Sequence, residues 1–151
     1  MEKKNWLLFI CNIVLIATGW ILAVYSYPRL PEKIPLWLSF MSQPMIWWPK
    51  SPLFFIYPAV QTVFAGVFIF LPNIKAVRES QNWSKSRTRE FLYLILIFFQ
   101  VVFIHIQRSL IFAAHNLQKG VDEFYFLFLF VIIILLIPFF HYREKILARF
   151  K

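Results

Sequence analysis

The sequence predicts an all-α integral membrane protein with four transmembrane helices in one domain over residues 1–151. Of its 151 residues, 60% are hydrophobic and 21% are aromatic, whereas soluble domains are about 45–50% apolar. Four apolar runs approach the roughly 20 residues that a bilayer-spanning helix needs. Six of the nine prolines gather in one stretch between the first two runs. A helical bundle interrupted by one irregular segment accounts for all three observations.

The predicted elements follow the chain in order. The first apolar run is longer than the hydrophobic part of a signal peptide and lacks a small-residue cleavage site, so we expect an uncleaved helix. Pro28 ends this helix, because proline disfavours helix at the preceding residue. The predicted helices cover residues 6–27, 53–71, 91–114 and 124–140, and the predicted connections are an outer segment at 28–52, a cytoplasmic loop at 72–90 and a basic tail at 141–151.

The outer segment carries its prolines too densely for a long helix. Ile34–Phe40 is predicted as a short strand, Met41–Pro44 as a turn and Met45–Trp48 as a return strand, which together make an irregular hairpin. Its residues are too apolar for a freely solvated loop. We expect the segment to lie at the membrane surface with its tryptophans at headgroup level, or to cap the bundle.

The distribution of Lys and Arg predicts the orientation. The net charge is +9, and cytoplasmic loops of membrane proteins collect basic residues. Eleven Lys and Arg residues fall at the amino terminus, in loop 72–90 and in the tail, against four in segment 28–52 and turn 115–123. Both termini are therefore predicted to be cytoplasmic. The residues expected to meet anionic lipid, rather than nucleic acid, are Arg78, Lys85, Arg87, Arg89, Arg143, Lys145, Arg149 and Lys151.

Arg108 is the most informative single residue, because charges inside membrane helices are rare and often functional. It lies about 9 Å before the end of its predicted helix, a distance that a long side chain can largely span. One hypothesis is a structural role, with the charge reaching headgroups or pairing with Asp122 or Glu123. The other is a role in ligand binding or gating.

The helix at 91–114 carries further polar residues. At 100° per residue, His105, Arg108 and His115 share a face about 80° wide, and Gln100 and Gln107 form a neighbouring stripe. This polar face is expected to point into the bundle, for helix–helix hydrogen bonds or a small polar cavity. The two histidines are about 15 Å apart along the axis, too far for one metal ion.

The chain offers few groups for catalysis. All seven acidic residues lie outside the predicted spans, and only three glycines are present. No phosphate loop, paired-cysteine, zinc-helix or serine-elbow motif occurs. We therefore predict a non-enzymatic protein without metal or cofactor. An intramembrane enzyme acting on lipid is kept as a further hypothesis, ranked after the two that are given below.

The stretch Leu30-Pro31-Glu32-Lys33-Ile34-Pro35, followed by Pro44, Trp47 and Lys50, resembles the bacterial membrane module called domain of unknown function 1648. The resemblance covers about residues 6–72. Where that family has a histidine this chain has Trp37, and where it has glycines this chain has Ser42 and Trp48. The module also opens larger proteins similar to those that give immunity to the sporulation-delaying toxin, which are non-enzymatic membrane proteins.

The resemblance implies an immunity-like or sensory interaction protein, whose outer segment meets a hydrophobic peptide, a lipid or a partner protein. A small transporter or channel subunit using the polar face is the alternative, and four helices would then need partner subunits or self-association. The candidate ligand- or partner-binding residues are Arg108, His105, His115, Gln100, Gln107, Trp37, Trp47, Trp48 and Lys50.

Overall fold

The computed structural model describes residues 3–38, 44–74 and 84–117, together with residues 127, 130–135, 138–139 and 142. The chain divides into two compact units, residues 1–121 and 122–151, and each is considered by itself. The described residues of the second unit are helical. Much of the predicted span at 124–140 and nearly all of the tail lie outside the described residues, so both remain predictions.

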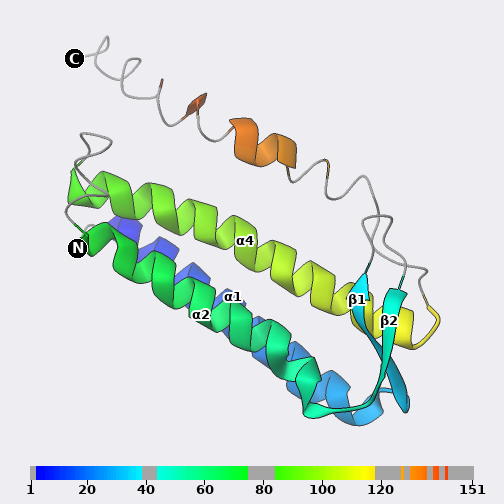
Figure 1. Ribbon diagram of the computed structural model, residues 1–151. Coiled ribbons are helices and arrows are strands. Elements are labelled where there is room, and N and C mark those ends of the chain that lie inside the picture. The colour runs from blue at the N-terminus through cyan, green and yellow to red at the C-terminus, as the bar shows by residue number, and fades with distance from the viewer. Residues whose placement is uncertain are drawn as a thin grey trace. The chain divides into compact units, whose positions relative to one another are not determined.

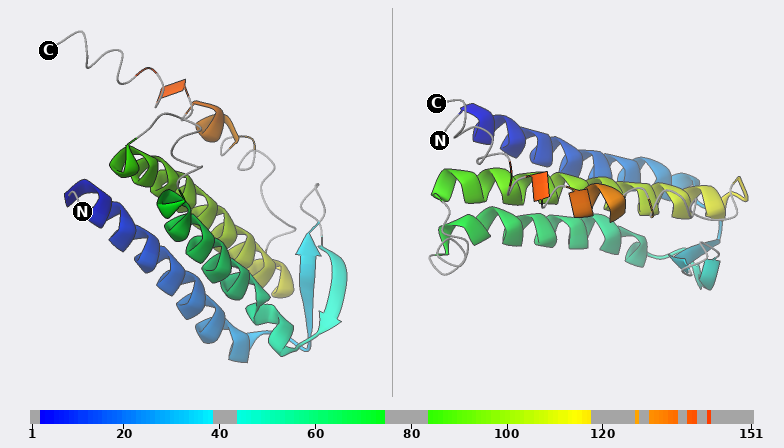
Figure 2. Two further views of the ribbon diagram at one scale, coloured as in Figure 1. Left: turned by 60° about the vertical axis from the view of Figure 1, so that its left-hand side comes forward. Right: turned by 90° about the horizontal axis from the view of Figure 1, so that it is seen from above.

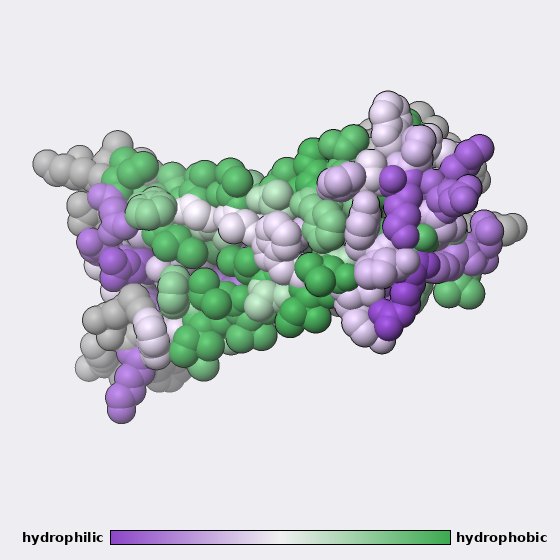
Figure 3. Space-filling model, turned by 90° about the horizontal axis from the view of Figure 1, so that it is seen from below, coloured by the Kyte–Doolittle hydropathy of each residue, from purple (hydrophilic) through white to green (hydrophobic). Residues whose placement is uncertain are grey.

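Three helices form the first unit: α1 (Lys3–Ser26), α2 (Ile56–Phe70) and α4 (Lys85–Ala114) (Figure 1). With their flanking turns they make stretches of 27, 22 and 30 residues that are long and apolar enough to cross a membrane. Hydrophobic residues cover the middle of the face in Figure 3, and hydrophilic residues gather at both ends. The predicted helices at 6–27 and 53–71 correspond to the first two stretches.

Prolines set the boundaries of α1 and α2. Pro28 follows α1 and lies in a short 3-10 turn, η1 (Tyr27–Arg29). A second turn, η2 (Pro52–Phe55), leads into α2, and a third, η3 (Leu71–Asn73), follows it. Pro58 is only the third residue of α2, where the backbone N–H has no partner within the helix, so proline is tolerated there.

Helix α4 begins six residues before the predicted Phe91, so the predicted loop at 72–90 is wrong over residues 85–90. The earlier start is explained by a capping residue at the amino terminus of α4. Ser84 has extended backbone and its Oγ accepts a hydrogen bond from the N–H of Arg87 at 3.3 Å, which satisfies one of the free donors of the first turn. Thr88 adds a bond from its Oγ1 to the Ser84 carbonyl oxygen at 3.1 Å. The resulting helix has 30 residues, or about 45 Å, half as long again as a hydrocarbon core.

Helices α1 and α4 run in the same direction, and α2 runs against both (Figures 1 and 2). Asn5 contacts Ser86 and Asn12 contacts Tyr93, and each pair is 81 residues apart. The two helices are therefore parallel and keep the same alignment at both contacts. Along α2 and α4 the order reverses: Phe64 packs on Phe103, and Phe68 packs on Phe99. Three helices that cross a membrane one after another alternate in direction in the same way.

The proline-rich segment forms an antiparallel pair of strands, β1 (Lys33–Leu38) and β2 (Pro44–Pro49). The predicted hairpin is confirmed, with strand ends that differ by one or two residues from those predicted. Ile34 lies opposite Trp48, and Pro35 lies opposite Trp47. Register irregularities follow on both sides of Trp37. Of the predicted turn Met41–Pro44, residues 41–43 lie outside the described residues, and Pro44 begins β2.

A small apolar core lies where the hairpin meets the helices. Ile34 and Phe54 are each 1% exposed, although both belong to the segment that separates α1 from α2. The core therefore joins the hairpin to the ends of α1 and α4. Its buried members are Ala23, Leu30, Ile34, Phe54, Ile111 and Ala114.

Candidate functional site

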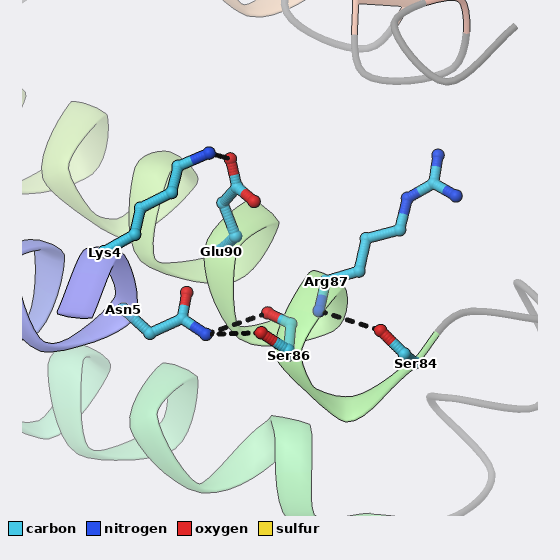
Figure 4. Close-up of polar contacts among 6 residues, drawn as sticks. All are labelled: Lys4, Asn5, Ser84, Ser86, Arg87 and Glu90. Carbon is cyan, nitrogen blue, oxygen red and sulfur yellow. Dashed lines mark hydrogen bonds and ion pairs between the residues drawn. The ribbon is translucent and has the colours of Figure 1, made fainter. Parts of the chain in front are cut away.

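A column of buried amide side chains runs between α1 and α4. Near the start of both helices, Asn5 donates from Nδ2 to Ser86 Oγ at 2.8 Å (Figure 4). Two turns further, Asn12 donates from Nδ2 to the carbonyl oxygens of Leu8 at 2.9 Å and Tyr93 at 3.2 Å. Asn5 is 2% exposed and Asn12 is fully buried. Polar side chains on facing helices stabilise bundles in membranes, where apolar side chains give no preference over lipid.

Gln61 of α2 enters this column and connects all three helices. Its Nε2 donates to Gln100 Oε1 at 2.5 Å and to the Leu15 carbonyl oxygen at 3.3 Å. Gly19 makes room for the carboxamide, because a Cβ at that position would overlap Gln61 Oε1 and approach its Cδ to 3.1 Å. The close approach of a long polar side chain to the α1 backbone therefore requires glycine at position 19.

The structure buries only some residues of the polar face predicted on the third helix. Gln100 and Gln107 are each 1% exposed and lie in the interior. Arg108 and His115 are exposed, and His105 is partly buried. The expectation that all five point inward is wrong for Arg108 and His115, because the bundle buries the narrow stripe at seven-residue spacing and these two lie beside it.

Gln107 differs from the other buried amides. Neither its Oε1 nor its Nε2 has a hydrogen-bonding partner among the described residues. Buried polar groups in native proteins are almost always satisfied, by protein or by ordered water. Gln107 thus extends the polar column of Gln61 and Gln100 toward the hairpin end, without a side-chain hydrogen bond to any described residue.

The contribution of α1 to this column was missed by the sequence reasoning. The buried residues Asn5, Asn12, Gly19 and Ser26 follow one another at intervals of seven, the spacing of a left-handed helix pair. The same interval separates Gln100 from Gln107 in α4. Matching seven-residue repeats of small and amide residues in two apolar runs are the signal that could have identified this interface.

Lys50 binds the end of the hairpin to the turn η1, which follows α1. Its Nζ donates to the carbonyl oxygens of Pro28 and Leu30, both at 3.0 Å, and lies 5.3 Å from the centre of the Tyr27 ring. Its backbone N–H donates to the Glu32 carbonyl oxygen at 2.7 Å. A lysine at carbonyl groups that end a helix stabilises that end. Lys50, a predicted binding residue, therefore has a structural role in this fold.

The tryptophans of β2 remain available at the surface. Trp47 and Trp48 are each 47% exposed, and the neighbouring Ile46 is 49% exposed. Adjacent residues of a strand point to opposite faces, so the two indoles emerge on the two faces of the hairpin. Trp37 belongs to β1, but its side chain lies outside the described part of the structure.

Polar contacts also join the two parallel helices at the opposite end of the bundle, near their amino termini (Figure 4). Lys4 forms an ion pair with Glu90, and Asn5 bonds to Ser86 next to it. Three residues predicted to meet lipid, Lys85, Arg87 and Arg89, lie in the first turns of α4. The others lie outside the described residues: Arg78, Arg143, Lys145, Arg149 and Lys151.

The chain matches no family model, no curated protein and no solved structure.

Proposed function

We propose that this chain is a non-enzymatic, immunity-like or sensory protein of the bacterial cytoplasmic membrane, which meets a hydrophobic peptide or partner through its outer hairpin. The observation that carries the proposal is the hairpin itself. Its base is held by Lys50 and by the buried Ile34. Its second strand nevertheless presents Trp47 and Trp48 half-exposed.

A surface fixed in advance binds more tightly than a mobile loop, because less conformational entropy is lost on binding. Aromatic residues such as Trp47 and Trp48 are also enriched among the residues that dominate binding energy. The immunity-like role further rests on the resemblance of residues 6–72 to the module of unknown function. The excess of Lys and Arg in the other connections supports placing the hairpin outside the cell.

The test uses cells that express the full chain and are challenged with the sporulation-delaying toxin peptide. We expect protection by the wild-type chain and its loss when Trp47 and Trp48 are both changed to Ala. The matched control is Trp6→Ala, a tryptophan of similar exposure, 53%, at the other end of α1. Equal protection by all three chains, or protection by none, would contradict the proposal.

A second candidate function, a subunit of a small transporter or channel, is favoured by the buried amides of Gln61, Gln100 and Gln107. The unpartnered atoms of Gln107 are suited to bind a small polar solute or water. Proteoliposomes would show a solute flux that Gln107→Leu abolishes and that the paired change at Trp47 and Trp48 leaves intact. Absence of flux above that of empty vesicles, for water and for monovalent ions, would rule this function out.

A further inference from the structure

Arg108 lies level with the hairpin end of α1, although α4 continues for six residues beyond Arg108. Asn5–Ser86 and Asn12–Tyr93 fix a parallel register of 81 residues between α1 and α4. The same offset places Arg108 at the height of Tyr27, the first residue after α1. Helix α4 continues beyond this level to Ala114, so the outer end of α4 does not mark the edge of the apolar belt.

Two of the exposed aromatic residues on α1, one near each end, are placed to mark the edges of that belt, and the exposed Trp20 lies between them. Trp6 is 53% exposed and Tyr25 is 65% exposed. The nineteen residue-to-residue steps from Trp6 to Tyr25 span about 28 Å, close to the roughly 30 Å of a hydrocarbon core. Tryptophan and tyrosine favour the two interfaces of a bilayer. By the same register Arg108 lies about 3 Å beyond the level of Tyr25, at the edge of the headgroup layer.

The Arg108 side chain also contacts an aromatic ring in the last turns of α4. Side chains on a helix lean toward its amino terminus, which for α4 is the far end from the hairpin. The Cζ of Arg108 lies 4.8 Å from the ring centre of Phe112, four residues further on, whose side chain leans back toward the turn of Arg108. The contact holds the guanidinium near the level of its own turn, at the edge of the headgroup layer.

The guanidinium remains available for an anion. Arg108 is exposed and forms no ion pair with a carboxylate among the described residues. Stacking on Phe112 uses the face of the guanidinium plane, while the N–H donors along its edge can bind two phosphate oxygens at once. Position and chemistry therefore agree on one kind of ligand.

We propose that Arg108 binds the phosphate of an anionic lipid in the leaflet at the hairpin end of the bundle. The site shares with the proposed function only the placement of the bundle in a membrane. It does not require the hairpin to bind a partner, so the toxin test and the lipid test fail independently.

The experiment counts bound lipids on the full-length chain. Protein reconstituted with phosphatidylglycerol and phosphatidylcholine is extracted in mild detergent, and native mass spectrometry measures the retained phosphatidylglycerol per chain. We expect Arg108→Gln to lose one retained phosphatidylglycerol relative to wild type. Arg108→Lys keeps the charge but not the bidentate geometry, so its retained phosphatidylglycerol should lie between the values for wild type and Arg108→Gln. This variant tests the proposal if Arg108→Gln does not fold.

The matched control is Arg29→Gln, which removes the same charge at the same end of the bundle. The Nη1 of Arg29 donates to the Tyr25 carbonyl oxygen at 2.8 Å, and its guanidinium stacks 3.8 Å from the Tyr25 ring centre. We expect lipid retention to be unchanged by this substitution. The proposal is overturned if Arg108→Gln retains as much phosphatidylglycerol as wild type, or if Arg29→Gln loses as much as Arg108→Gln.

A further arm separates lipid from soluble anion. Inorganic phosphate at millimolar concentration is added to the lipid-free protein, and thermal stability is compared with that after adding phosphatidylglycerol. We expect only the lipid to raise the melting temperature of the wild type, and to raise it less for Arg108→Gln. If inorganic phosphate gives the same Arg108-dependent rise, the site takes a soluble anion and the lipid proposal is wrong.

Discussion

The carboxamide Nε2 of Gln61 donates to Oε1 of Gln100 across 2.5 Å, which joins α2 to α4 in the interior of the bundle. Both side chains are 1% exposed. Since Gln61 also reaches the Leu15 carbonyl oxygen of α1, one side chain holds three helices together. Four predictions test this arrangement and the features around it.

Gly19→Ala should destabilise the bundle, because the added methyl group overlaps the carboxamide of Gln61. Overpacking of a well-packed interior typically costs about 1–3 kcal/mol. The control is Gly66→Ala in α2, where an added Cβ meets nothing within 4 Å. Thermal unfolding in detergent, followed by circular dichroism, should show a lower melting temperature for the first variant only. Equal melting temperatures for the two variants would show that Gln61 does not pack on Gly19.

Gln61 and Gln100 should show strong coupling in a double-mutant cycle. Changing either residue alone to Leu leaves the other amide buried without its partner, at a cost of about 1–3 kcal/mol. Changing both removes the unmet polar group, so the double variant should be less destabilised than the sum of the single variants. Unfolding free energies of the four proteins in bilayers give the coupling directly. Additive effects would contradict a direct hydrogen bond.

Lys50→Met should loosen the hairpin and leave the helices intact. The substitution removes two hydrogen bonds to the turn that follows α1, at Pro28 and Leu30, and the methionine side chain keeps a similar apolar length. Hydrogen exchange should become faster at the backbone N–H of residue 50, which donates to the Glu32 carbonyl oxygen. Exchange in the middle of the helices should stay unchanged. Lys33→Met provides the comparison, since Lys33 is an exposed residue of β1. The same acceleration in both variants would assign the effect to lost surface charge.

The parallel register of α1 and α4 can be tested by cross-linking. With Cys11 replaced by Ser, cysteines introduced at Asn5 and Ser86 should form a disulfide on mild oxidation, because these side chains are in hydrogen-bond contact. Cysteines at Asn5 and Ala113 should not react, since these residues belong to opposite ends of the two helices. A reaction of the second pair would indicate antiparallel packing of α1 and α4.

Much of the fold could be predicted because hydrophobic length and proline position act locally. Apolar runs of about 20 residues must form helices in lipid, where every backbone polar group needs a partner within its own segment. The prolines from Pro28 to Pro52 likewise exclude a long helix whatever surrounds them, and the hairpin between them followed from short strand-like runs. The start of α4 was misplaced because the capping role of Ser84 depends on backbone geometry that composition does not reveal.

The candidate site was predictable only in part, because it depends on which residues of different helices face one another. Periodicity on one helix identified Gln100 and Gln107, but not Asn12 or Gly19 on its neighbour. Spacing alone also could not separate the buried glutamines from the exposed Arg108, since they lie on adjoining faces of one helix. Burial is decided by the partner helix, and a single apolar run does not specify that partner.

The sequence by itself determined three apolar helices of the described bundle and the irregular segment between the first two, because length, hydrophobicity and proline content act within each segment. The tertiary structure alone decided the register of α1 against α4. That register sets the height of Arg108. The packing of α2 against α4 brings Gln61 to Gln100, and the folding of the hairpin brings Lys50 to the carbonyl oxygens of Pro28 and Leu30. The physical reason is that these contacts join residues far apart in the chain, whose meeting depends on how whole helices pack.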